Sequence, residues 1–100
     1  MKHDSNTLNF VRKFEKSLKY NFKDFNFLLR SLIHKSYSNE NKEYRHINNE
    51  KLELLGDSVL NLIVTHYIYL RFQDLTEGEL VKLKSALVSE PALSEFANSI

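Results

Sequence analysis

The chain has 100 residues, of which 42% are hydrophobic, and this size allows one small domain with a modest core. It contains no Cys, so disulfides and thiolate metal sites are excluded, and with one Pro and two Gly it is poor in helix breakers. Its net charge of +1 combines two unlike halves, because residues 1–46 hold ten Lys or Arg and five Asp or Glu, whereas residues 47–100 hold four and eight.

Apolar residues recur at helical spacing along the chain, and this pattern predicts an all-α fold. Residues 1–9 are expected to form a flexible N-terminus. A first helix follows, with the apolar stripe Phe10, Val11, Phe14 and Leu18. Residues 19–23 are a connection in which Tyr20 and Phe22 are expected to turn inward, and Asp24 is the predicted N-cap of the next helix.

The second helix carries the stripe Phe25, Leu28, Leu29, Leu32 and Ile33. Polar sequence without a period follows, and residues 38–47 are predicted to be a loop. A long helix then begins after Asn48 or Asn49 as N-cap and reaches about Phe72. Beyond Val59 its apolar residues cover most of the circumference, which predicts a buried central helix.

Two shorter helices complete the predicted fold. Thr76 and Glu79 match a capping box at the start of the first of them. Ser89 and Glu90 precede Pro91, which suits the first turn of a new helix. The apolar stripe of this last helix runs to the end of the chain without a stop signal, as expected of a truncated domain; it consists of Leu93, Phe96, Ala97 and Ile100.

Three acidic residues near the start of the long helix are the main candidates for chemistry: Glu50, Glu53 and Asp57. Their spacing of i, i+3 and i+7 places them within about 60° of one another on a helical wheel, in line with the apolar Val64 and Ile68. Carboxylates so placed repel one another and lose hydration, and a divalent cation would offset both costs. Oxygen ligands suit Mg²⁺ or Mn²⁺ and not Zn²⁺.

A solvated acidic face is the alternative, and the spacing supports it equally. The helix dipole favours acidic residues in a first turn, which can account for Glu77 at the start of its own helix but explains Asp57 poorly. Gly56 costs about 1 kcal/mol inside a helix, which suggests that another backbone approaches it. Glu79 is explained by its capping role, and His34 is interpreted as a hydrogen-bonded packing residue.

The stretch that carries these acidic residues resembles the ribonuclease III family signature and its continuation, Asn-Glu-Arg-Leu-Glu-Phe-Leu-Gly-Asp-Ser-Val-Leu. In this chain it reads Asn49-Glu50-Lys51-Leu52-Glu53-Leu54-Leu55-Gly56-Asp57-Ser58-Val59-Leu60. Residues 32–37 resemble the family's Ala-Leu-Thr-His-x-Ser-Tyr stretch, and residues 77–89 resemble the segment after its central helix. The resemblance covers residues 10–100 in the family's order and spacing.

This resemblance implies the helical ribonuclease III endonuclease fold and a homodimer that hydrolyses phosphodiester bonds in double-stranded RNA to give 5′-phosphate ends. By position, Glu53 and Asp57 are expected to be catalytic residues and direct ligands of Mg²⁺, with Mn²⁺ as an alternative metal. Glu50 and Glu77 are expected to be outer metal-binding residues of the same cluster. RNA recognition should rest on the A-form shape and the backbone of the duplex. The basic residues of the first half of the chain are candidates for phosphate contacts, but the sequence does not show which of them bind.

The chain departs from the family pattern in several places. Leu54 stands where the family commonly has a Phe that packs into the partner subunit, and Lys51 replaces Arg. The sequence ends at Ile100, before the helix that carries the family's second acidic pair, and the double-stranded-RNA-binding domain that commonly follows is expected to be absent. Residues 10–100 are therefore interpreted as the N-terminal part of a catalytic domain, and the chain alone is expected to be inactive or nearly so.

A non-catalytic relative that binds structured RNA or a protein partner is the competing hypothesis. Retention of the four acidic residues argues against it, because a binding module gains nothing from clustered anions facing RNA. No apolar run approaches membrane-spanning length, and the N-terminus lacks the apolar core of a signal peptide. A cytoplasmic protein without a membrane partner is therefore expected.

Overall fold

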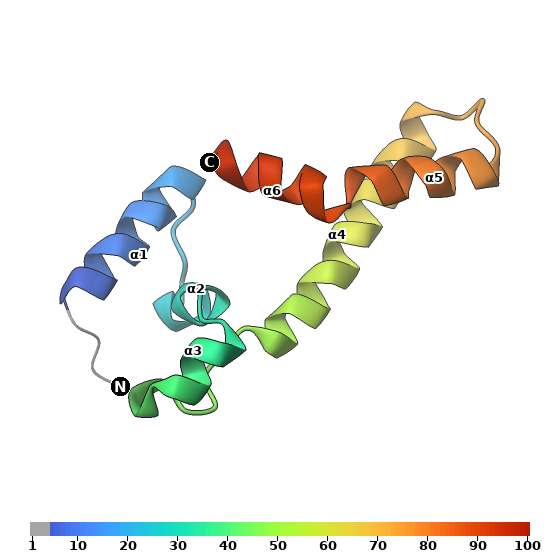
Figure 1. The fold of residues 1–100 in the computed structure, drawn as a ribbon. Helices are drawn as coiled ribbons and strands as arrows, with labels where there is room; N and C mark the ends of the chain where they lie inside the picture. Colours follow the sequence, from blue (N-terminus) through green and yellow to red (C-terminus); the bar gives the residue numbers. More distant parts are fainter. Residues whose placement is uncertain (1–4) are drawn as a thin grey trace. The chain divides into compact units, whose positions relative to one another are not determined.

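A computed structural model describes residues 5–100, and the regular structure in that range is entirely helical (Figure 1). The all-α prediction is thereby confirmed for these residues. The chain forms two compact units, Met1–Glu53 and Leu54–Ile100, and each is described by itself. The elements are α1 (Ser5–Leu18), α2 (Phe25–Ser31), α3 (Lys35–Glu40), the 3₁₀ turn η1 (Lys42–Tyr44), α4 (Glu50–Arg71), α5 (Glu77–Leu87) and α6 (Glu90–Asn98).

Helix α1 begins at Ser5, whereas its apolar stripe predicts a start near Phe10. Thr7 and Leu8 are half-buried in the additional turn. Of the predicted flexible N-terminus, residues 5–9 are therefore helical, and residues 1–4 lie outside the described part of the chain.

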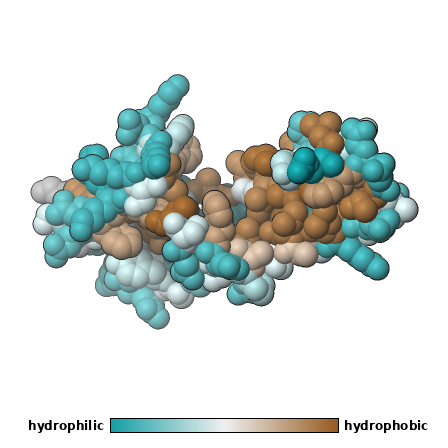
Figure 2. Space-filling view, turned by 90° about the horizontal axis from the view of Figure 1, so that it is seen from above, coloured by the Kyte–Doolittle hydropathy of each residue, from teal (hydrophilic) through white to brown (hydrophobic). Residues whose placement is uncertain are grey.

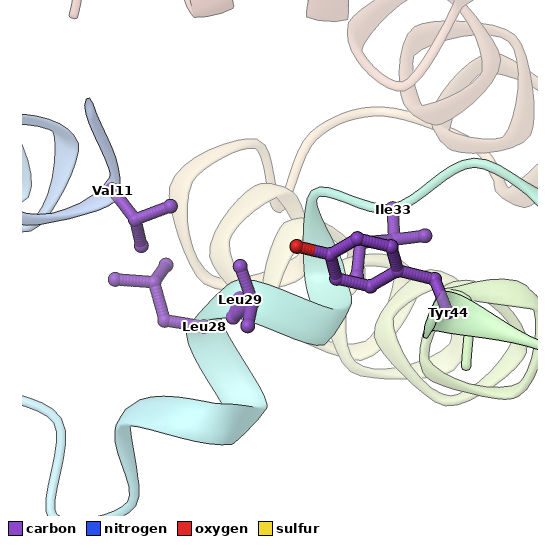
Figure 3. Packing of buried hydrophobic residues seen from close by; sticks show 5 residues of the cluster. All are labelled: Val11, Leu28, Leu29, Ile33 and Tyr44. Atoms are coloured by element: carbon purple, nitrogen blue, oxygen red, sulfur yellow. The ribbon is translucent and has the colours of Figure 1, made fainter. Parts of the chain in front are cut away.

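The core of the first unit forms between α1, α2 and the segment that follows them. Val11 points from α1 toward Leu28, and the Tyr44 ring lies beside Ile33 (Figure 3). Asp24 caps α2 as predicted, because its carboxylate accepts the Asn26 N–H at 3.0 Å. The predicted stripes supply most of this core, whose buried residues are Val11, Leu28, Leu29, Ile33 and Tyr44.

Further predictions for the first unit are wrong. Phe10 and Leu32, which belong to the predicted apolar stripes, are 67% and 40% exposed. Tyr20, predicted to turn inward, is 58% exposed. Its ring contacts the Phe22 ring edge-on, with 4.9 Å between the centroids. Of these two aromatic residues, only Phe22 packs against the core. The segment 38–47, predicted to be a loop, contains the end of α3 and the turn η1. Ser38 is buried there and donates its hydroxyl to the Tyr44 carbonyl at 2.7 Å, which closes the segment and holds Tyr44 in the core.

The capping box and the first-turn proline predicted for the second unit are confirmed. Thr76 and Glu79 form the capping box at the start of α5, with reciprocal bonds of 3.2 and 3.1 Å. Ser89 caps α6 by accepting the Ala92 N–H at 3.3 Å, and Pro91 occupies the first turn.

The prediction that α4 is a buried central helix is wrong for this chain. Ile68 of α4 is fully buried. Most other apolar side chains of this helix are not covered by the rest of the described chain. Figure 2 shows hydrophobic side chains gathered on the surface of the second unit. The large apolar side chains of α4 that stay exposed are Leu54, Leu55, Val59, Leu62, Ile63, Tyr67, Tyr69 and Leu70.

None of the helices described for residues 5–100 combines the length and the hydropathy that a bilayer crossing requires.

Candidate functional site

Two asparagines anchor the start of α4, the helix that carries three of the four acidic candidates. Asn48 Oδ1 accepts the Glu50 N–H at 3.0 Å and satisfies one of the free donors of the first turn. Asn49 stands directly before the helix, and its carbonyl accepts the Glu53 N–H at 2.7 Å. The prediction of an asparagine cap is confirmed, with the side-chain bond made by Asn48.

Further hydrogen bonds tie this start to α2 within the first unit. The Asn49 side-chain amide donates to the Ser31 carbonyl at 2.9 Å. Arg30 donates from Nε to the Asn48 carbonyl at 3.0 Å and from Nη2 to the His46 carbonyl at 3.4 Å. His46 has a φ of 64°, a left-handed conformation that is uncommon for a residue with a side chain. Arg30 therefore braces a strained connection that leads directly into the acidic part of α4.

Glu50 and Glu53 are the acidic candidates of the first unit, and both are exposed. Lys35 Nζ lies 3.8 Å from Glu50 Oε1, and the two side chains are 60% and 63% exposed. An exposed pair of this kind contributes about 0–1 kcal/mol, so it leaves the Glu50 carboxylate available to another cation.

Asp57 and Glu77 are the acidic candidates of the second unit. Asp57 is exposed, and its backbone carbonyl accepts the Asn61 side-chain amide at 2.8 Å. Glu77 is the first residue of α5, where its carboxylate meets the positive end of the helix dipole. It lies at the edge of a hollow of about 230 Å³, whose other lining residues are Thr65, Ile68, Tyr69, Leu80, Val81 and Lys84.

The chemistry of these four side chains suits a hard cation, because they offer only carboxylate oxygens. Glu50, Glu53 and Asp57 all lie in α4, at a spacing that shares one face of a helix. Residues 5–100 nevertheless contain no group of three or more Asp, Glu, His or Cys side chains close enough to hold a metal ion. The donor type fits Mg²⁺, whereas the described residues do not complete a site, and the metal-binding roles stay predictions.

His34 has a local structural role that the sequence indicated only in part. It is the N-cap of α3, and its Nδ1 accepts the Ser36 N–H at 3.1 Å. The side chain is exposed, so His34 is a hydrogen-bonded cap at the surface and not a packing residue. The bracing residue Arg30 was not singled out at all, since its bonds span 16 and 18 residues and no local pattern reports them.

Gly56 does not have the close neighbour that its position in the helix predicts. A Cβ built on it would meet no atom within 4 Å, and its φ is not in the left-handed region. Within this chain the backbone of α4 at Gly56 is therefore open, between the acidic first turns and the exposed apolar residues that follow.

Comparison with known proteins places these features in a family. The family model described as Ribonuclease-III-like matches residues 24–100. Ribonuclease 3 of Fusobacterium nucleatum is 49% identical over 86 residues, which are 86% of this chain and 37% of that protein. Ribonuclease 3 of a Campylobacter jejuni strain is 47% identical over 90 residues, which are 90% of this chain and 38% of that protein.

A solved structure agrees with the sequence relatives. It shows the nuclease domain of ribonuclease III from Campylobacter jejuni, with structural flexibility in the region involved in dimer formation. Its TM-score with this chain is 0.79 at 45% identity, and the match covers 89% of this chain and 58% of that one. The chain spans 37–38% of the length of the Fusobacterium nucleatum and Campylobacter jejuni ribonuclease 3 proteins that it matches.

Proposed function

The chain belongs to the ribonuclease-III-like family, and we propose that it forms part of an endoribonuclease that hydrolyses phosphodiester bonds in double-stranded RNA to give 5′-phosphate ends. The observation that carries this proposal is the run of residues 49–60, which puts three carboxylates at helical spacing on the exposed first turns of α4. We also propose that the protein acts in the cytoplasm.

Glu53 and Asp57 are the proposed catalytic residues and direct ligands of Mg²⁺ or Mn²⁺, with Glu50 and Glu77 as outer acidic residues. A bound Mg²⁺ would activate a water and neutralise charge on the scissile phosphate. The protein contributes placement, because Asn48, Asn49 and Arg30 fix where α4 begins. The exposure of the carboxylates keeps them accessible to a polyanionic substrate and its cation.

We further propose that the endonuclease works as a homodimer. The exposed apolar side chains of α4 favour this, since contiguous exposed apolar surface commonly marks an interaction site. Leu54 is 74% exposed at the position where the family commonly has an aromatic residue that packs into the partner, so this departure bears on how strongly the dimer forms.

The chain by itself is expected to cleave RNA duplexes poorly or not at all, because residues 5–100 do not gather three metal-binding side chains. The function is therefore best tested in a chimera, in which residues 11–100 replace the matching stretch of Campylobacter jejuni ribonuclease 3. The measurement is Mg²⁺-dependent cleavage of a long RNA duplex, with an EDTA control and an assay for 5′-phosphate ends.

An active, EDTA-sensitive chimera that loses cleavage with Glu53→Gln or with Asp57→Asn supports the proposal. Glu95→Gln is the matched control, because it removes one exposed carboxylate of α6 that is not among the proposed ligands. A folded chimera that binds duplex RNA without cleaving it would favour the non-catalytic hypothesis. Full activity in the Glu53→Gln or Asp57→Asn variant would refute the assignment of these residues.

A further inference from the structure

Helix α1 has two chemically distinct faces. One face packs into the core of the first unit through Val11, with Phe14 and Leu18 partly buried beside it. On the opposite side of the helical wheel lie Asn9, Arg12, Lys13 and Lys16, which are all exposed. We call these four residues the basic face of α1. They line a shallow hollow of about 390 Å³.

The positive charge of this face is not balanced by the residues around it. Residues 5–23 contain five Lys or Arg and a single acidic residue, Glu15. The Glu15 carboxylate accepts the Phe22 N–H at 3.0 Å, so it is engaged by the connection that follows the helix. In the described part of the chain, no carboxylate forms an ion pair with Arg12, Lys13 or Lys16.

Arg12 is held in place and still has donors to offer. Its guanidinium carbon lies 4.8 Å from the centroid of the Phe25 ring, a distance at which the ring face attracts the cation. Stacking of this kind engages the flat face of the guanidinium and leaves the N–H groups at its edge for a phosphate. The packing of α1 into the core therefore fixes the orientation of the basic face, and the stacking on Phe25 holds the Arg12 side chain.

We propose that the basic face of α1 contacts the sugar-phosphate backbone of an RNA duplex, with Arg12, Lys13 and Lys16 as phosphate-binding residues. The inference rests on the proposed function for the identity of the polyanion. Arg12 and Lys16 are one helical turn apart, about 6 Å along the axis, so the three cations form a compact patch. Contacts of this type position a protein on nucleic acid without reading its sequence, which suits an enzyme that recognises duplex shape.

A lipid surface fits this helix less well. An amphipathic helix binds a bilayer by inserting its apolar face, but the apolar face of α1 is taken up by the core through Val11, Phe14 and Leu18. Only the charged face is free, so binding to a bilayer would depend on charge alone.

The test compares duplex binding by the full 100-residue chain and two charge-matched double variants. Lys13→Gln with Lys16→Gln removes two charges from the basic face. Lys42→Gln with Lys82→Gln removes two charges from exposed positions outside α1. The binding of a short fluorescent RNA duplex is measured in EDTA by anisotropy over a range of salt concentrations, and thermal melts by circular dichroism check that each variant folds.

The α1 variant is expected to bind the duplex roughly tenfold or more weakly near 0.1 M salt and to lose about two units from the slope of log K against log salt. The control variant is expected to change far less. Equal affinity of the α1 variant and the parent chain, equal losses in both variants, or no duplex binding by the parent chain would each overturn the inference.

Anionic phospholipid vesicles are the second probe. Vesicle binding that depends on Lys13 and Lys16, with duplex binding unaffected, would overturn the inference in favour of a lipid partner. The cleavage assay of the chimera is a separate readout, so the nuclease proposal can stand or fall without the basic face of α1.

Discussion

Gly56→Ala tests whether the surface of α4 is open next to its acidic residues. The substitution adds one methyl group to the interior of a helix, at a place where that carbon would meet no atom within 4 Å. Because there is no clash to relieve, the change in helix propensity should dominate. We therefore expect the free energy of unfolding to rise by about 1 kcal/mol, the usual difference between Gly and Ala inside a helix.

Thermal unfolding at low protein concentration is the direct measurement. For a domain of this size, about 1 kcal/mol corresponds to a rise of roughly 4–8 °C in Tm. Gly78→Ala is a matched control in α5, where the added Cβ would make only an ordinary contact, 4.0 Å from Thr76 Oγ1. The control should also be tolerated, with a smaller gain because Gly78 lies in the first turn.

Destabilisation of the dilute chain by Gly56→Ala would refute the reasoning, since it would mean that some part of the same chain approaches the helix there. A different result is informative at high concentration. If Gly56→Ala stabilises the monomer but weakens self-association, the partner copy packs against Gly56. In that case the sequence-based expectation of a close neighbour is correct for the assembly although it fails within the chain.

The remaining predictions concern the packing that supports the site. Ser38→Ala removes the buried bond to the Tyr44 carbonyl and should cost about 1–3 kcal/mol in urea unfolding, and no loss would show that water replaces the hydroxyl. Ile68→Ala empties a position that is 1% exposed and should cost about 2–5 kcal/mol, and a loss below that range would mean that the second unit relaxes around the cavity. Arg30→Met removes two bonds that brace the connection before α4, so amide hydrogen exchange at Glu50 and Glu53 should accelerate, and unchanged exchange would refute the bracing role.

Sequence reasoning succeeded where structure is decided within a few residues. Asp24 and Thr76 cap their helices through bonds to N–H groups two and three residues away, so the pattern and the contact occupy the same short segment. The stripe of α2 likewise predicted Leu28 and Leu29 in the core, because one face of a short helix packs as a unit.

It failed where the deciding contact is further away. Residues 38–47 look like a loop because they have no apolar period, yet backbone hydrogen bonds around η1 and a buried hydroxyl bond from Ser38 to the Tyr44 carbonyl order them. Tyr20 and Phe22 are equally apolar in the sequence, and only the packing of the unit decides that Phe22 goes in and Tyr20 stays out. Arg30 shows the same limit, since it acts on carbonyls that are 16 and 18 residues away.

Helix α4 shows a different kind of limit. Apolar residues around the whole circumference indicate that a helix is covered, but the pattern does not state which surface covers it. In this chain Leu54, Leu62 and Ile63 are exposed, so the described residues do not supply the predicted cover. The spacing of Glu50, Glu53 and Asp57 fits a bound cation and a solvated acidic face equally, and the described residues bring no group of three metal ligands together. Both halves of α4 therefore carry a pattern that the described residues do not account for, and the proposed dimer and the proposed Mg²⁺ site would each account for one of them.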